Sequence, residues 1–280
     1  WSEKPLYKLC MGAFVARDHH KLGTFIDRCY KWGYFIRTED QVLAEASKKQ
    51  IESPSPCSGN SGGVSLDTAS PDCISIMWCG RFLKWKHPEL AVLLAQRLKG
   101  RNVPFRLKLY GDGALRAKME QAVGKLGLED VVAFHGNVSN VQVREAMKSA
   151  DIFVFTSDRQ EGWGAVAGES LSCGCALVAS EDIGSVPYLI KEGYNGLIFR
   201  GPSPYSSMKN PDMRSLEDLE QKVCALLEHR DRMAAMQKNA VELMYRLWSP
   251  KRAAESLLQL ICDLKSGRET SIKEGPCSKA

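Results

Sequence analysis

Two glutamates eight residues apart, together with two cations upstream, are the side chains best suited to chemistry in this sequence. Glu161 and Glu169 lie in the segment DRQEGWGAVAGESLSCGC, which covers residues 158–175. A carboxylate has two acceptor oxygens and no donor, so it suits the paired hydroxyl groups of a ribose or a sugar. Arg81 and Lys86, in the segment GRFLKWK, offer a planar fork and a compact charge to phosphate oxygens. Cations in such a segment are also typical of a solvated loop, so the neighbouring segments must decide between the two interpretations.

The elements around the two glutamates are predicted to place them at one edge of a sheet. An apolar run over residues 152–156 is typical of a buried strand, and a helix is predicted from about residue 164 to residue 173. Glu161 would then precede this helix, and Glu169 would lie inside it. Open parallel sheets bind ligands outside the carboxyl ends of their strands, so both carboxylates are expected to face a ligand there.

Backbone groups of the same turn add to the predicted binding surface. Gly162 and Gly164 allow a ligand to approach the backbone closely. The first turn of the helix, at Ala165 and Val166, presents N–H groups that suit a phosphate. Trp163 lies between the two glycines and is also expected near the ligand, although its position is more typical of a packing residue than of a side chain that stacks on a base.

Strands and helices alternate along the middle of the chain, which predicts an α/β fold with a Rossmann-like parallel sheet and helices on both faces. Strands are predicted at residues 74–79, 107–110, 131–134, 152–156, 176–179 and 197–199. Helices are predicted at residues 88–99, 114–126, 140–149, 164–173 and 185–191, and the remainder is helical, at 215–229, 231–247 and 250–265.

The first 52 residues are too few to form a second domain of the same kind. A strand is expected at residues 6–15, with helices at 21–31 and 41–50. Residues 53–72 are rich in Ser, Pro and Gly and are interpreted as a linker or mobile loop. The ligand-binding domain is predicted at residues 73–265, and the polar tail at 266–280 is expected to be loose.

Composition and charge narrow the class of protein. With 44% hydrophobic and 25% charged residues, the 280-residue chain is typical of a soluble globular protein. A formal charge of +5 is too mild to indicate nucleic acid and suits an anionic ligand or lipid surface. Neither a signal peptide nor an apolar run of membrane-spanning length is seen, which favours a cytoplasmic location. The ten cysteines form no CxxC pair, so we expect reduced thiols, with disulfides or a metal as minor alternatives.

Several segments resemble, in order, those of the retaining, nucleotide-sugar-dependent glycosyltransferases of family 4, whose fold of two Rossmann-like domains is called GT-B. The Glu-x7-Glu pair alone would be weak. The segment GRFLKWK, the turn GDG at residues 111–113, and the stretch LGLEDVVAFHG that ends at Gly136 resemble further landmarks of that family. The segments IGSVP and GYNGLIF, at residues 183–187 and 193–199, resemble later ones. The resemblance covers about residues 74–260.

The resemblance implies a role for each charged residue. Arg81 and Lys86 would stabilise the diphosphate leaving group, with Lys84 as the alternative to Lys86. Glu161 would act near the donor sugar and the diphosphate, and Glu169 would accept hydrogen bonds from both ribose hydroxyls. These implications make Glu161, Arg81 and Lys86 the candidate catalytic residues.

The backbone of several loops is expected to contact the donor. Such contacts carry little side-chain signal, so the sequence does not separate UDP from GDP. The donor-binding residues that the resemblance implies, besides Glu169, are Gly80, Gly111, Gly113, Gly136, Asn137, Gly162, Trp163, Gly164, Ala165 and Val166.

The family's chemistry and the lack of a metal-binding motif predict that no metal or other cofactor is required. Retaining transfer in this fold is thought to proceed without a protein nucleophile, and the departing diphosphate itself takes the acceptor's proton. No Asp-x-Asp metal motif stands at a predicted strand end. Many members use a histidine of the N-terminal domain at the reaction centre, so His19 and His20 are candidates for that role. In the alternative interpretation, Asp18 caps a helix that begins there.

The resulting hypothesis is a glycosyltransferase that moves a sugar from a UDP-sugar or GDP-sugar to a glycan or lipid-linked acceptor with retention. Residues 1–52 resemble the end of an acceptor domain, so we expect a truncated chain that binds the donor but transfers little. Its location is expected to be cytoplasmic, at the inner face of the membrane if it associates peripherally. The alternatives are a minimal enzyme, an epimerase or phosphorylase of the same fold, and a non-catalytic nucleotide-sugar-binding module or partner subunit.

Overall fold

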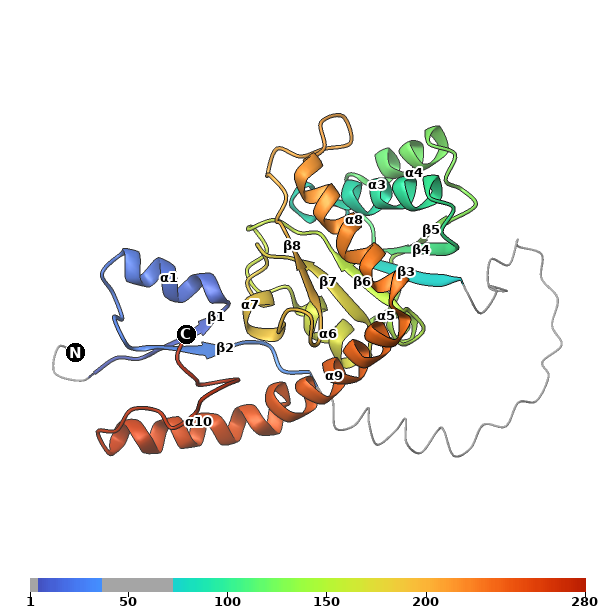
Figure 1. Cartoon of the computed structure of the whole chain (residues 1–280). Helices are drawn as coiled ribbons and strands as arrows, with labels where there is room; N and C mark the ends of the chain where they lie inside the picture. The colour runs from blue at the N-terminus through green and yellow to red at the C-terminus, as the bar shows by residue number, and fades with distance from the viewer. Residues whose placement is uncertain (1–4, 37–72) are drawn as a thin grey trace, which may run out of the picture.

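The computed structural model of the protein describes residues 5–36 and 73–280 (Figure 1). Its centre is a parallel six-stranded sheet with the strand order β5-β4-β3-β6-β7-β8. The helix expected at residues 41–50 and the linker expected at 53–72 lie outside the described residues. The strands are β3 (Ile74–Cys79), β4 (Phe105–Tyr110), β5 (Val132–Gly136), β6 (Ile152–Phe155), β7 (Ala176–Ser180) and β8 (Leu197–Phe199).

Helices cover both faces of this sheet, which confirms the predicted fold class (Figure 1). One face carries α3 (Pro88–Gly100), α4 (Arg116–Lys125) and α8 (Met213–Glu228). The other carries α5 (Asn140–Lys148), α6 (Ala165–Ser172), α7 (Val186–Leu189) and α9 (Arg230–Trp248), after which α10 (Pro250–Lys265) extends away. Every residue of β6 and β7 is buried, because helices cover both sides of these strands.

The N-terminal prediction was wrong in both its elements. Residues 6–15 do not form one strand: β1 (Lys8–Met11) ends before Gly12, and α1 (Ala13–Lys21) begins after it. Gly12 has a φ of 109°, so the apolar run divides there into a strand and a helix. The helix expected at 21–31 is replaced by a turn with left-handed residues and by β2 (Cys29–Trp32). Strand β2 pairs in parallel with β1.

The unit formed by β1, α1 and β2 packs directly against the large domain. The amide of Ala13 donates to the carbonyl oxygen of Gly184 at 2.8 Å. A side chain at Gly12 would come within 2.8 Å of the Gly162 carbonyl oxygen. This close approach brings β1 and α1 next to the turn that precedes α6, where the predicted site lies.

The polar tail was expected to be loose, and this prediction was wrong. The amide of Lys31 donates to the carbonyl oxygen of Ser278, and the amide of Cys277 donates to that of Lys31, both at 2.8 Å. The buried carboxylate of Asp263 accepts hydrogen bonds from the amide and hydroxyl of Ser271. The tail therefore returns from α10 and forms an antiparallel bridge to β2 at Tyr30. The sequence does not predict this packing, because the tail is polar and its partners lie far away along the chain.

Nine cysteines fall within the described residues, and all of them carry free thiols. Across the same residues, the structure contains no helix that is both long and apolar enough to cross a membrane.

Candidate active site

The residues predicted to bind the donor lie along the carboxyl edge of the sheet, in the loops that follow β3, β4, β5 and β6. Strand β3 is the first of the large domain, and the chain continues from it to β4 on one side and later to β6 on the other. This is a topological switch point, where open α/β sheets bind ligands. Arg81 and Lys86 follow β3, and Glu161 follows β6.

Short backbone contacts hold the glycine-containing loops together at this edge. The amide of Gly80 donates to the Tyr110 carbonyl oxygen at 3.0 Å, and the amide of Gly111 donates to that of Gly136 at 2.7 Å. Gly111 has a φ of +116°, and a side chain there would collide with the backbone of Gly80. Gly113 has a φ of +151°, and its side chain would meet the backbone of Phe82. The two glycines of the GDG turn are therefore required by conformation and by close packing.

Lys86 and Glu161 form an ion pair across the switch point. Their side chains are only 15% and 16% exposed, so water screens the pair weakly. The same carboxylate oxygen of Glu161 accepts a hydrogen bond from the buried hydroxyl of Ser157 at 3.2 Å. Of the two lysines proposed for the diphosphate, Lys86 is therefore the one that the structure places beside Glu161. Lys84 is exposed, and its Nζ lies 5.7 Å from the centre of the Tyr205 ring.

The loop that carries Lys86, η1 (Lys84–Lys86), is fixed by groups at the end of β6. The Thr156 hydroxyl donates to the Lys86 carbonyl oxygen at 2.6 Å and accepts from the Trp78 indole at 2.9 Å. The amide of Asp158 donates to the Trp85 carbonyl oxygen at 2.9 Å. The backbone of Trp85 and Lys86 is thus held in place by residues that follow β6 and lead to Glu161.

Glu169 lies in α6, with its carboxylate largely withdrawn from water. Within the described residues it accepts no hydrogen bond, and burial raises its pKa, an effect that the Arg144 guanidinium partly offsets. Two nitrogens of Arg144 are also buried without a hydrogen-bond partner. Burial and then the charge of Glu169 raise the pKa of the Cys79 thiol to about 12, while Lys86 lowers it. Cys79 therefore lies within electrostatic reach of both charged groups.

Arg81 is exposed and forms neither an ion pair nor a hydrogen bond through its side chain within residues 5–36 and 73–280. Its guanidinium is therefore available to a ligand at the edge of the sheet. Asn137 is likewise exposed, directly after the carboxyl end of β5, while Gly136 is buried with a φ of +68°. His135, just before them, stacks on the ring of Tyr110 at 4.5 Å.

The turn before α6 has the geometry expected of a phosphate-binding helix start. Gly164, the residue before the helix, has a φ of +77°, and a side chain there would lie 2.7 Å from the Phe155 ring. Helix α6 begins at Ala165, so the amides of Ala165 and Val166 lack partners within the helix. Gly162 has open space where a side chain would stand. An anion could therefore reach this turn.

Trp163 is buried in an aromatic cluster, away from any position where it could stack on a base. Its ring centre lies 5.9 Å from that of Trp248, 6.3 Å from that of Tyr188 and 6.1 Å from that of Tyr34. Its indole also lies against the backbone of Gly33. Trp163 thus joins residues 33–36 to the large domain, and its predicted contact with the donor would be through the backbone.

The two N-terminal histidines lie in the last turn of α1, and the alternative interpretation of Asp18 was wrong. Helix α1 begins at Ala13, so Asp18 does not cap its start. A ring nitrogen of His19 lies 3.0 Å from the Thr24 hydroxyl. Asp18 instead lies 3.8 Å from Arg159, in the loop that carries Glu161. The roles of His19 and His20 at a reaction centre stay a prediction.

The sequence analysis missed a buried histidine beside Lys86. His87 is fully buried, with Nδ1 2.8 Å from the Glu89 carboxylate and Nε2 3.2 Å from the Asp158 carboxylate. Its backbone is left-handed, with a φ of 46°. Burial alone would lower the pKa of His87, but the hydrogen bonds and charges of Glu89 and Asp158 outweigh burial and raise it. Since the amide of Glu161 donates to the Asp158 carbonyl oxygen, this contact joins the loops of Lys86 and Glu161.

We expect His87 to make stability depend on pH. Because its pKa is raised in the fold, its contribution is fully present below its unfolded pKa and is lost as the pH rises through the folded pKa. His87→Asn removes the titrating group while tolerating the left-handed backbone. Urea denaturation from about pH 5 to pH 9 should show the largest loss of stability in the variant at low pH, narrowing as the pH rises. A difference that is constant across this range would contradict the assignment.

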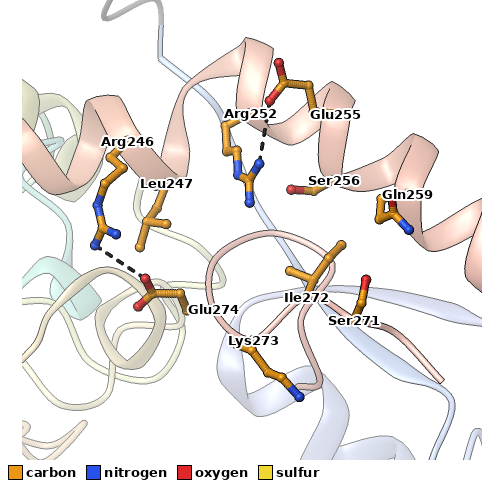
Figure 2. A pocket seen from close by; sticks show the side chains of 10 residues that line it. All are labelled: Arg246, Leu247, Arg252, Glu255, Ser256, Gln259, Ser271, Ile272, Lys273 and Glu274. Carbon is orange, nitrogen blue, oxygen red and sulfur yellow. Dashed lines mark ion pairs between the residues drawn. The ribbon is translucent and has the colours of Figure 1, made fainter.

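A separate cavity of about 660 Å³ lies between α9, α10 and the tail, as Figure 2 shows. Its charged groups are largely paired with one another: Arg246 lies 3.4 Å from Glu274, and Arg252 lies 3.6 Å from Glu255. None of the residues predicted to bind the donor lines this cavity.

The sheet order, the glycine turns and the charged pair at the switch point define an α/β domain with a candidate ligand site at the carboxyl edge of its sheet. The family model of glycosyl transferases group 1 matches residues 71–242, which is more than half of the chain. The chain therefore belongs to the glycosyl transferases group 1 family.

Curated relatives match only part of their own length. D-inositol 3-phosphate glycosyltransferase of Paenarthrobacter aurescens is 29% identical over 144 residues, covering 50% of this chain and 35% of that protein. The gpi3 subunit of phosphatidylinositol N-acetylglucosaminyltransferase of Schizosaccharomyces pombe is 26% identical over 195 residues, covering 69% of this chain and 40% of that protein.

Solved structures show the same fold at low identity. The crystal structure of Anabaena HepE in complex with UDP has a TM-score of 0.67 and 15% identity, and the match covers 93% of this chain and 64% of HepE. WaaG, a glycosyltransferase involved in lipopolysaccharide biosynthesis, has a TM-score of 0.61 and 17% identity, with 88% of this chain and 61% of WaaG covered.

Proposed function

We propose that this chain forms the donor-binding part of a retaining glycosyltransferase of family 4. It would move a sugar from a nucleotide diphosphate sugar to a glycan or lipid-linked acceptor. The observation that carries the proposal is the partly buried ion pair of Lys86 and Glu161 at the switch point between β3 and β6. The UDP complex of the similarly folded HepE and the glycosyltransferase names of the sequence relatives support it.

The proposed chemistry rests on stabilising the charge of the leaving diphosphate. Arg81 is free to form a bidentate contact, Lys86 supplies a second cation, and the amides at the start of α6 supply neutral donors. Glu161 balances the charge of Lys86 through their ion pair. A bound diphosphate would compete for this lysine and leave the Glu161 carboxylate to accept a hydrogen bond from the donor sugar.

Glu169 is proposed to recognise the ribose. Its carboxylate is withdrawn from water and accepts no hydrogen bond within the described residues, so it has unused acceptor capacity. Two adjacent ribose hydroxyls would supply the missing donors and favour the charged form of Glu169. The ribose would thus give this carboxylate hydrogen-bond donors that the described side chains and amides do not supply.

We propose that donor binding requires no metal ion, because Arg81, Lys86 and the helix start together supply positive charge for the diphosphate. The acceptor would be either a glycan or a lipid-linked molecule. A cytoplasmic location, at the inner face of the membrane if it associates there, stays a prediction.

Titration calorimetry with UDP and with GDP, in buffer with and without EDTA, tests the proposal. We expect one nucleotide to bind with an affinity that EDTA does not change. Loss of binding on adding EDTA would contradict the metal-free site. A folded sample that binds neither nucleotide would contradict the donor-binding function itself.

A further inference from the structure

A second cavity, of about 900 Å³, lies between α4, η1 and the loop of residues 205–209. Its volume falls in the usual range of small-molecule sites. Lys84 lies two residues from Lys86, and it is the only lining residue that was considered for the donor. Glu89 of α3 also lines the cavity, and its carboxylate is paired with the His87 ring at 2.8 Å. The rest of the lining belongs to α4 with its flanking residues and to the loop after β8, which the proposed donor site does not use.

Four lysines from three separate segments line this cavity. Lys84 comes from η1, Lys118 and Lys125 from α4, and Lys209 from the loop. All four are exposed, and none forms an ion pair within the described part of the chain. Like charges brought together in this way repel one another, so an anion bound among them would relieve the repulsion.

The walls between the lysines are mostly aliphatic. Leu115, Met119, Ala122 and Leu126 recur at helical spacing along one side of α4, and Met208 lies in the loop. The cavity therefore offers apolar surface bounded by cations, which suits a ligand with a hydrocarbon part and an anionic part.

We propose that this cavity binds an anionic lipid, with the phosphate of the headgroup among the lysines and the adjoining hydrocarbon against the aliphatic side of α4. Lysine ammonium groups bind phosphate as point charges, and basic pockets of this kind bind lipid headgroups. A nucleotide fits less well, because the aromatic ring at the rim, Tyr205, already lies against Lys84. The inference concerns a site separate from the donor site and does not depend on the proposed function.

Vesicle flotation with the whole chain tests the site. Vesicles of phosphatidylcholine alone are compared with vesicles that also contain phosphatidylglycerol. The triple variant Lys118→Glu, Lys125→Glu and Lys209→Glu is expected to lower binding to the anionic vesicles more than about tenfold. A control changes the same charge elsewhere, on the exposed residues Lys238, Lys251 and Lys265 of α9 and α10. The control should retain most of the binding, and equal losses in the two triple variants would overturn the proposal.

A variant that fills the cavity tests whether the lipid enters a pocket or only contacts a charged surface. Ala122→Trp leaves every lysine in place but occupies the apolar wall, so it should also lower vesicle binding about tenfold if the hydrocarbon enters. Thermal denaturation confirms that the variant is folded. Wild-type affinity in folded Ala122→Trp would show that the lysines act only as a surface patch and would overturn the proposal.

Soluble probes distinguish a lipid from a free phosphate. A short-chain phosphatidic acid, used below its micellar concentration, should bind the wild-type protein and compete with the vesicles. Inorganic phosphate at the same concentration should not compete. Equal competition by both would show a simple phosphate site and would contradict the lipid assignment.

Discussion

Lys86→Met is expected to weaken nucleoside diphosphate binding by about 1.5–3 kcal/mol, which is roughly 10- to 100-fold in Kd. The lysine faces the switch point and supplies one of the two cations proposed for the diphosphate. If transfer or donor hydrolysis is measured, its rate should fall by about 10²–10³, because charge develops on the leaving group in the transition state. Calorimetry with the nucleotide that the wild type binds provides the first measurement.

One control separates lost binding from lost folding, and a second separates the two candidate lysines. Lys86→Met leaves the partly buried Glu161 carboxylate without its cation, so the single variant is expected to be less stable. The double variant Lys86→Met and Glu161→Gln removes that unpaired charge and should recover stability without recovering affinity. Lys84→Met tests the alternative lysine and should leave nucleotide affinity almost unchanged. A larger loss in Lys84→Met than in Lys86→Met would assign the diphosphate to Lys84.

Glu169→Gln is expected to weaken nucleotide binding by about 1–3 kcal/mol, because one acceptor oxygen becomes a donor facing the ribose hydroxyls. Its effect on folding should have the opposite sign. Burial raises the pKa of Glu169, so its charged form costs stability as the pH rises through that pKa. The neutral amide avoids this cost, and urea denaturation near pH 7 should show a variant at least as stable as the wild type.

The same residue predicts a pH dependence of binding. Ribose hydroxyls donate to the charged carboxylate, so wild-type affinity should fall as the pH drops through the pKa of Glu169, whereas the Gln variant should lack this dependence. Glu161→Gln is the matched control: it should spare nucleoside diphosphate affinity more than affinity for the intact donor sugar. Identical losses of UDP or GDP binding in the two variants would contradict the separate roles.

The sequence predicted the large domain well because its strands are apolar runs and its turns contain glycine. The segment 152–156 is the clearest case: its buried positions leave little choice but a central strand, and Gly162 and Gly164 mark the turn that follows. The ion pair of Lys86 and Glu161 could not be read from periodicity, because it joins residues 75 apart. Lys86 and Glu161 come together because the sheet order places β3 beside β6.

The failures have local and long-range causes. At residues 6–15, one glycine with a positive φ divides an apolar run whose halves form different elements. The tail around Cys277 is polar in sequence, but its amides pair with Lys31 near the other end of the chain. His87 precedes a proline and was not considered a site residue, since its partner Asp158 lies 71 positions away. Such contacts become visible only when the fold places the partners together.

Hydrogen exchange with and without bound nucleotide is the sharpest test of a donor site between β3 and β6, since it maps the site along the whole backbone. We expect slower exchange in the four segments at the carboxyl edge of the sheet, at residues 80–87, 111–116, 136–139 and 161–169. The cavity between α9, α10 and the tail should exchange at an unchanged rate. Protection confined to residues 246–274, with no change in the loops after β3 and β6, would contradict a donor site at this switch point.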